Sequence, residues 1–135
     1  MLGHLTWGHD QSADVSTVEE LDAVLSSIAR DASDTKTIIA VELFMDDDTG
    51  MCITVGDQLS PACFYSRRGG PLVVNAIGRG GERAEPEGDD LFVFSYHGEY
   101  SEVLRRDTLP IETAREGMRL YFLKGRRPDN ITWGP

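Results

Sequence analysis

The sequence predicts an α+β fold: a single domain in which two helices pack on one face of an antiparallel meander sheet. Two segments place apolar residues at helical spacing, one near 17–31 and one after Pro110. Between them lie short apolar runs that are rich in β-branched and aromatic residues and separated by turn-forming residues, as in hairpin-connected strands. The 135 residues suffice for one hydrophobic core, so the domain is expected to span 1–135.

The first third of the chain predicts a short strand, a helix and a buried strand. Residues 1–14 are expected to contribute a short strand with a mobile end. Ser16 and Glu19 form a capping-box pattern, in which the Ser16 hydroxyl accepts from the Glu19 amide at the start of the helix. The nearly continuous apolar run at 37–45 predicts a central strand that is covered on both faces.

The middle of the chain predicts the meander. Turns rich in Gly, Asp and Pro separate the apolar runs. The segment 78–90 is rich in glycine and carboxylates and is expected to be a loop, because such a composition cannot bury a core of its own. The expected strands are 51–55, 62–66, 72–77 and 91–96, with 102–104 extending the sheet.

The last quarter predicts the second helix and a closing strand. Pro110 suits the first turn of a helix, and Gly125, followed by two arginines and a proline, suits its end. The segment 131–133 (ITW) is expected to close the fold as a short strand.

The charge balance limits the classes of partner. Thirteen basic residues stand against 23 acidic ones, a net charge of −10. Nucleic-acid binding needs clustered Lys and Arg, so the balance argues against it and favours either plain solubility or a basic protein partner. No apolar run approaches the roughly 20 residues that cross a bilayer, and the first residues lack the pattern of a signal peptide. The sequence therefore predicts a cytoplasmic protein with no membrane partner.

No catalytic or metal-binding motif is recognisable. The three histidines lack the spacing of a metal or nucleophile motif, and Cys52 and Cys63 are expected to be buried, reduced thiols on neighbouring strands. The run 46–48 (DDD) lacks the ligand pattern of a calcium loop and is expected to be a solvated turn. We therefore predict no metal, no cofactor and no enzymatic activity.

One segment crowds aromatic and acidic side chains at the end of an apolar strand. It contains Tyr96, Glu99, Tyr100 and Glu102. Tyrosine gives a large, rigid contact area, and carboxylates pair with Arg or Lys across interfaces, so a binding rim is one interpretation. An ordinary sheet edge whose hydroxyls are satisfied is the other, and the sequence alone leaves both open.

Several of these motifs resemble a known family when they are taken in order. They are TVEELD at 17–22, the acidic hairpin at 41–57, the patch around Tyr96, Tyr100 and Glu102, LPI at 109–111, GRRP at 125–128 and Trp133. Together they resemble the first-described immunity-protein family of bacterial polymorphic toxin systems, common in actinomycetes. The resemblance implies a protein without catalytic activity that binds a secreted toxin domain, often of the nucleic-acid deaminase superfamily, in the producing cell.

The resemblance and the charge together give a first hypothesis. A cognate toxin domain with a basic surface would bind in a one-to-one complex, through aromatic anchors and carboxylates. The expected partner-binding residues are Tyr96, Glu99, Tyr100, Glu102, Asp46, Asp47, Asp48, Glu87, Asp89 and Asp90.

Two other hypotheses remain. One is a small-ligand or sensory module whose aromatic pocket is lined by Trp7, Phe94, Tyr96 and Trp133. The other is an enzyme in which His97 works with Glu99 or Glu102 as acid and base.

Overall fold

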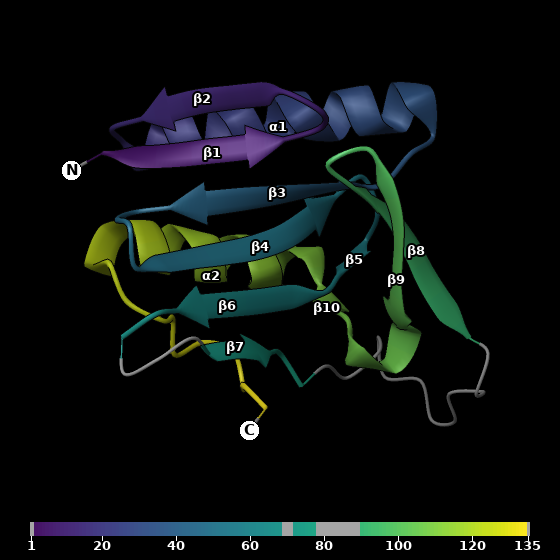
Figure 1. The fold of residues 1–135 in the computed structure, drawn as a ribbon. Coiled ribbons are helices and arrows are strands. Elements are labelled where there is room, and N and C mark those ends of the chain that lie inside the picture. The colour runs from purple at the N-terminus through teal and green to yellow at the C-terminus, as the bar shows by residue number, and fades with distance from the viewer. Residues whose placement is uncertain (1, 69–71, 78–89, 135) are drawn as a thin grey trace.

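The computed structural model describes residues 2–68, 72–77 and 90–134. In this part of the chain, the long strands form one sheet and both helices cover the same face of it (Figure 1), as the sequence predicts. The sheet order is β2-β1-β3-β4-β6-β7, and β8 joins β3 and carries β9. The strands of this sheet are β1 (Gly3–Trp7), β2 (Gln11–Val15), β3 (Ile39–Phe44), β4 (Thr49–Val55), β6 (Ala62–Ser66), β7 (Leu72–Asn75), β8 (Leu91–Tyr96) and β9 (Glu99–Leu104).

Residues 3–15 form a hairpin where the sequence predicts a single short strand. β1 pairs antiparallel with both β2 and β3, and the turn between β1 and β2 contains Gly8 at φ +63°. The sequence of β2, QSADV, has only two apolar residues and a mostly exposed burial pattern. Because β2 is an edge strand, it carries little of the apolar alternation that would have predicted it.

Helix α1 (Val18–Thr35) starts one residue later than predicted and ends later. Thr17, rather than Ser16, caps it by accepting from the Glu20 amide at 3.0 Å. The Glu20 carboxylate in turn accepts from the Ser16 amide at 2.6 Å, so the reciprocal pattern of a capping box is present but shifted. The helix ends at Lys36 in the left-handed conformation.

The core lies between the helices and one face of the sheet. Cross-strand neighbours on this face form an apolar row across five strands, and its members are at most 6% exposed. The sequence alternation predicts this, because every second residue of each strand points to the same side. The row consists of Leu5, Leu43, Met51, Phe64 and Val74.

Helix α2 (Ile111–Lys124) completes the core layer. Pro110 precedes its first residue and pairs with Leu59 in a two-stranded sheet of β5 (Leu59–Ser60) and β10 (Leu109–Pro110). As predicted, Gly125 ends the helix in the left-handed conformation, and its N–H donates to the Tyr121 carbonyl at 2.7 Å. The buried Tyr121 hydroxyl reaches Thr49 Oγ1 at 2.7 Å and ties α2 to β4.

Several predicted strand boundaries differ in the structure: β3 is shorter than 37–45, and β4 begins at Thr49 rather than 51. The segment 131–133 forms only an isolated bridge between Trp133 and Ala76. The indole N–H of Trp133 donates to the Pro128 carbonyl at 2.8 Å, and the Trp133 ring packs on Phe64. Side-chain packing, rather than a continuous run of backbone hydrogen bonds, therefore holds this end of the chain. β7 ends at Asn75 rather than 77, and β9 begins at Glu99 rather than 102.

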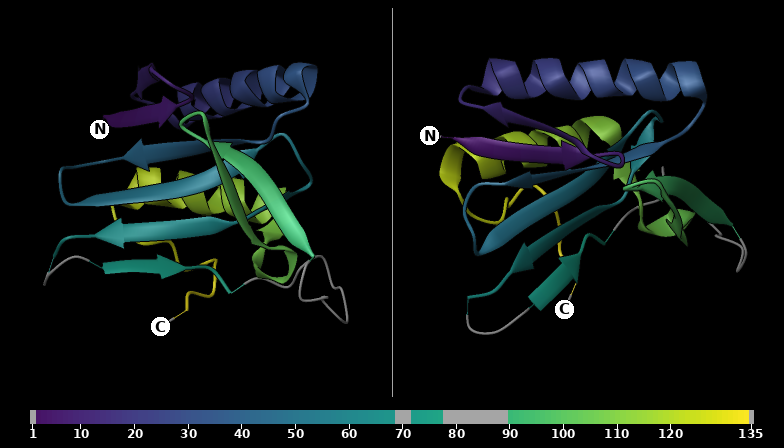
Figure 2. Two further views of the ribbon diagram at one scale, coloured as in Figure 1. Left: turned by 45° about the vertical axis from the view of Figure 1, so that its right-hand side comes forward. Right: turned by 45° about the horizontal axis from the view of Figure 1, so that its top comes forward.

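The other face of the sheet, which we call the open face, is more polar. A row of cross-strand partners crosses it and consists of Thr6, Glu42, Cys52, Cys63 and Asn75. The β8–β9 hairpin stands at one end of this face, joined to β3 by a parallel bridge between Ser95 and Ile39 (Figures 1 and 2). The hairpin and the open face are therefore the parts of the fold that no helix covers.

Candidate functional site

The β8–β9 hairpin divides the four predicted patch residues between its two faces. In an antiparallel pair, directly opposed residues share a face. Tyr96 is opposite Glu99 on the inner face, which is turned toward the open face of the sheet. Tyr100 and Glu102 lie on the outer face, opposite Ser95 and Val93 respectively. The four residues therefore do not form one contiguous rim, although they lie on one hairpin.

On the inner face, Glu42 of β3 receives two side chains from the hairpin. Tyr96 OH donates to Glu42 Oε2 at 2.8 Å, and His97 Nε2 lies 2.8 Å from Glu42 Oε1. Burial and the neighbouring Glu42 carboxylate raise the pKa of Tyr96 above its ordinary value. The phenol thus stays protonated at neutral pH and donates to the carboxylate.

His97 fixes the hairpin tip to two parts of the sheet. Its Nδ1 lies 3.1 Å from the Gly8 carbonyl, while its Nε2 faces Glu42. The hydrogen bond to Glu42 raises the pKa of His97, against the opposing effect of burial. The residue itself sits at φ +52°, in the left-handed region at the turn. Sequence analysis missed Glu42; the available signal was a lone carboxylate inside the apolar run 37–45.

A groove of about 280 Å³ lies between the open face and the inner face of the hairpin. Cys52 and Cys63 line it as free thiols on adjacent strands, as the sequence predicts, but their side chains are half-buried rather than buried. The hydrogen bond with Cys63, burial and the Glu42 carboxylate raise the pKa of Cys52, so this thiol stays protonated at neutral pH.

The outer face of the hairpin is open to solvent. Tyr100 is 69% exposed and Val93 is 43% exposed, which is high for side chains of this size. The Tyr100 hydroxyl donates to the Glu102 carboxylate, and this contact raises the pKa of Tyr100. The hairpin therefore presents an aromatic ring and a carboxylate in a fixed relative position.

The Asp46–Asp48 turn has a structural role of its own. Asp46 Oδ1 accepts from the amides of Asp48 and Thr49, both at 2.8 Å, and from the Thr49 hydroxyl. Arg68 donates to Asp46 Oδ2 at 2.9 Å. Burial acts to raise the pKa of Asp46, but these hydrogen bonds outweigh it and lower the pKa. Asp46 is thus committed to the turn, while Asp47 is exposed beside it.

The predicted acidic clusters lie apart from one another. The hairpin joins β3 at Ile39, whereas the Asp46–Asp48 turn follows the other end of β3 (Figure 1). At roughly 3.3 Å per residue, the length of β3 separates the hairpin from this turn by about 20 Å. Asp90, before β8, lies 3.4 Å from Arg105 Nε. Glu87 and Asp89 lie outside the described residues.

The aromatic pocket is not assembled as predicted. Phe94 and Tyr96 line the groove on the open face, but Trp7 and Trp133 pack against the core on the helix side. The proposed acid–base pair also differs, because His97 contacts Glu42 rather than Glu99 or Glu102. Across residues 2–68, 72–77 and 90–134, no cluster of three or more His, Cys, Asp or Glu side chains is suited to a metal.

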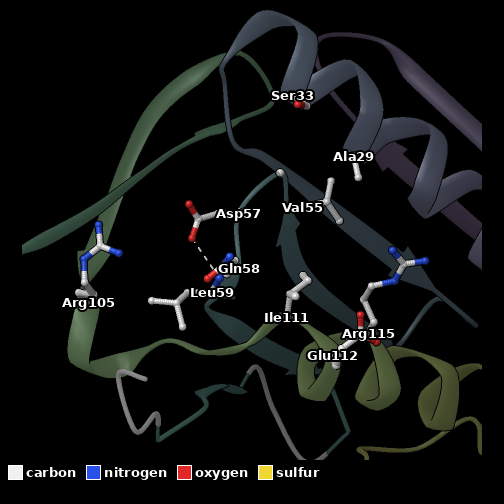
Figure 3. A pocket seen from close by; sticks show the side chains of 11 residues that line it. Ala29, Ser33, Val55, Asp57, Gln58, Leu59, Arg105, Ile111, Glu112 and Arg115 are labelled. Atoms are coloured by element: carbon white, nitrogen blue, oxygen red, sulfur yellow. Dashed lines mark hydrogen bonds between the residues drawn. The ribbon is translucent and has the colours of Figure 1, made fainter. Parts of the chain in front are cut away.

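A larger depression of about 640 Å³ lies where the ends of the two helices meet the β4–β5 loop (Figure 3). Arg105 and Arg115 stand on opposite sides of it, and Asp57 and Glu112 lie between. Arg115 Nε is buried without a hydrogen-bond partner, but its Nη2 donates to the Asp22 carbonyl at 3.2 Å. The depression therefore carries both signs of charge and offers no single ligand chemistry.

Comparison with known proteins identifies the family. The model of the family "Immunity protein Imm1" matches residues 9–135, from the β1–β2 turn to the C-terminus. The chain belongs to the Imm1 family. No curated protein sequence matches it.

The Imm1 match covers both helices, the β8–β9 hairpin and every strand of the sheet except β1. An immunity protein has a cognate toxin as its partner, so the exposed surfaces of this Imm1 fold are candidate toxin contacts. No helix in the described residues has the length and apolar character needed to span a membrane.

Proposed function

We propose that this Imm1 protein binds a cognate toxin domain as a one-to-one complex in the cytoplasm of the producing cell and blocks it without chemistry of its own. The observation that carries the proposal is the outer face of the β8–β9 hairpin. There, Tyr100 is 69% exposed beside Glu102, on a chain whose family is one of immunity proteins. Tyrosine is enriched in interface hot spots, and a neighbouring carboxylate can pair with a Lys or Arg of the partner.

The net charge of −10 supports a basic toxin surface as the target. A toxin of the nucleic-acid deaminase type must hold a polyanion, which requires a cationic cleft. The hairpin strands β8 and β9 carry Glu99 and Glu102 and no Lys or Arg, so their field is complementary to such a cleft. We propose occlusion of that cleft as the mode of inhibition.

The test is protection on co-expression with the variable C-terminal domain of a toxin, which we expect a neighbouring reading frame to encode. The hairpin variant combines Glu99→Lys, Tyr100→Ala and Glu102→Lys. It leaves Tyr96, His97 and Glu42 in place, so the attachment of the hairpin is preserved. We expect this variant to lose protection and its Kd for the inactivated toxin domain to rise at least about 100-fold.

The matched control combines Glu19→Lys and Asp129→Lys, exposed positions on other elements that give the same change of charge. It should retain protection. A third variant, Asp47→Lys, asks whether the separate acidic turn also contacts the toxin. Equal loss of protection in the control would mean that net charge alone determines protection. Full protection by the hairpin variant would show that the hairpin does not contact the toxin.

A further inference from the structure

The hydrogen-bond pattern of the hairpin shows which backbone groups of β9 face outward. Antiparallel partners alternate between pairs that exchange backbone hydrogen bonds and pairs that do not. Arg105 N–H donates to the Asp90 carbonyl at 3.0 Å, one step beyond the Leu91↔Leu104 pair. The bonded pairs along the hairpin are therefore Phe92↔Val103, Phe94↔Ser101 and Tyr96↔Glu99.

The remaining residues of β9 turn their backbone groups away from β8. The N–H and C=O groups of Tyr100 and Glu102, and the N–H of Leu104, point to the outer edge of the hairpin. Among the described residues, β9 pairs only with β8, so this edge has no neighbouring strand. The exposed side chains of Glu99, Tyr100 and Glu102 flank this edge.

An open edge of this kind is a template for strand addition. We propose that the outer edge of β9 is the docking site for an extended, cationic segment of the toxin domain, which adds to the hairpin as a third strand. The inference rests on the proposed function and specifies how the toxin is held. Main-chain hydrogen bonds to Tyr100, Glu102 and Leu104 align the segment, and its Lys or Arg side chains pair with Glu102 and Glu99.

The charge of β9 favours a toxin segment, rather than a second copy of this chain, as the strand that pairs with its outer edge. Two β9 edges placed side by side would bring Glu99 and Glu102 of one copy near those of the other. Like charges on opposed strand positions destabilise pairing. A strand with basic residues gains from the same carboxylates, and the exposed Tyr100 and Val93 add apolar contact area on the outer face.

Hydrogen exchange provides a direct readout of the proposed strand pairing. The probe is the inactivated toxin domain in complex with this protein, with individual amides followed by NMR. The amides of Tyr100, Glu102 and Leu104 should exchange quickly in the free protein and at least about tenfold more slowly in the complex. The amides of Ser101 and Val103 already donate to β8, so their rates should change less. The alternation identifies strand addition, since side-chain docking would not produce it.

Leu104→Pro removes one outward N–H with little strain, because Leu104 already has φ −71°, close to the value that proline requires. Leu104→Ala is the matched control that removes the side chain and keeps the N–H. We expect Leu104→Pro to bind the toxin domain about fivefold more weakly than Leu104→Ala. An amide spectrum of each variant checks that the hairpin is retained.

The outcomes separate the two proposals. If the wild-type protein does not bind the toxin domain, both the proposed function and the proposed docking site are wrong. If the wild type binds but the β9 amides show no alternating protection and the two Leu104 variants bind equally, the docking site is overturned while the function stands. Alternating protection together with weaker binding of Leu104→Pro supports strand addition.

Discussion

At the residue scale, His97 controls how firmly the hairpin is held. Both of its partners, the Gly8 carbonyl and the Glu42 carboxylate, can only accept hydrogen bonds. A neutral imidazole can donate to one of them, whereas the protonated ring donates to both. The same geometry accounts for the raised pKa of His97, because the hydrogen bond to Glu42 favours the charged form.

This contact gives the fold a specific pH dependence. Because the folded pKa of His97 lies above its unfolded value near 6.5, the stabilisation is fully present below about pH 6.5 and is lost as the pH rises through the folded pKa. His97→Asn, which tolerates the left-handed backbone, should lower the free energy of unfolding by about 1 kcal/mol at pH 5.5. The difference from wild type should shrink by pH 9. Urea unfolding across this range measures it, and a difference that grows with pH would contradict the assignment.

Asp46 and Asp47 are neighbours in sequence but have different roles. Asp46 accepts three hydrogen bonds within the turn and one from Arg68, while Asp47 is exposed. Asp46→Ala should therefore cost about 1–2 kcal/mol of stability at pH 7, and Asp47→Ala should be nearly neutral. Since the pKa of Asp46 is lowered, its contribution is present above about pH 4 and is lost as the pH falls through the folded value. Equal unfolding midpoints for the two variants would refute this division.

At the scale of elements, Asp22 joins the two helices. Arg119 Nε of α2 lies 2.9 and 3.1 Å from the two carboxylate oxygens of Asp22 on α1, and Arg115 Nη2 donates to the Asp22 carbonyl. Asp22→Ala leaves the half-buried Arg119 without this partner and should lower stability by about 1–2 kcal/mol. Thermal or urea unfolding measures the change.

Asp31→Ala provides the comparison for Asp22→Ala, because Asp31 is an exposed carboxylate on the same helix. It should change stability by less than about 0.5 kcal/mol. If the two variants were equally stable, the pairs with Arg119 would contribute only as weakly as ordinary surface ion pairs.

The elements that the sequence predicts well are those with a strong apolar period. The strands at 62–66 and 91–96 and the end of α2 at Gly125 lie where expected, because alternation and a left-handed glycine are local signals. β2 and the first half of β9 are polar edge strands and lack such a signal. The contact of Glu42 with Tyr96 and His97 joins residues more than 50 positions apart, so no local pattern could indicate it.

The same limit applies to the candidate site. Composition indicated aromatic and acidic residues near Tyr100, and in the structure the side chains of Tyr100 and Glu102 are exposed. It could not assign Tyr96 and Tyr100 to opposite faces of the hairpin, because that requires the register between β8 and β9. It also could not separate the acidic turn from the hairpin, since their distance depends on how β8 joins β3.

At the scale of the whole molecule, the net charge of −10 should govern how fast the toxin is captured. Long-range attraction accelerates encounter between oppositely charged surfaces and is screened by salt, whereas short-range contacts in the formed complex are screened much less. The association rate constant with the inactivated toxin domain should therefore fall at least about tenfold between roughly 20 mM and 500 mM salt. The dissociation rate constant should change by less than about threefold.

Stopped-flow fluorescence across a salt series can separate the two rate constants. The Glu19→Lys and Asp129→Lys control described above should show slower association and a shallower salt dependence, because it reduces net charge away from the hairpin. The hairpin variant should in addition dissociate faster, since it removes contacts in the complex as well as charge. If association were independent of salt, the acidity of this protein would serve solubility alone, and recognition of the toxin would depend only on the shape and hydrogen bonds of the hairpin.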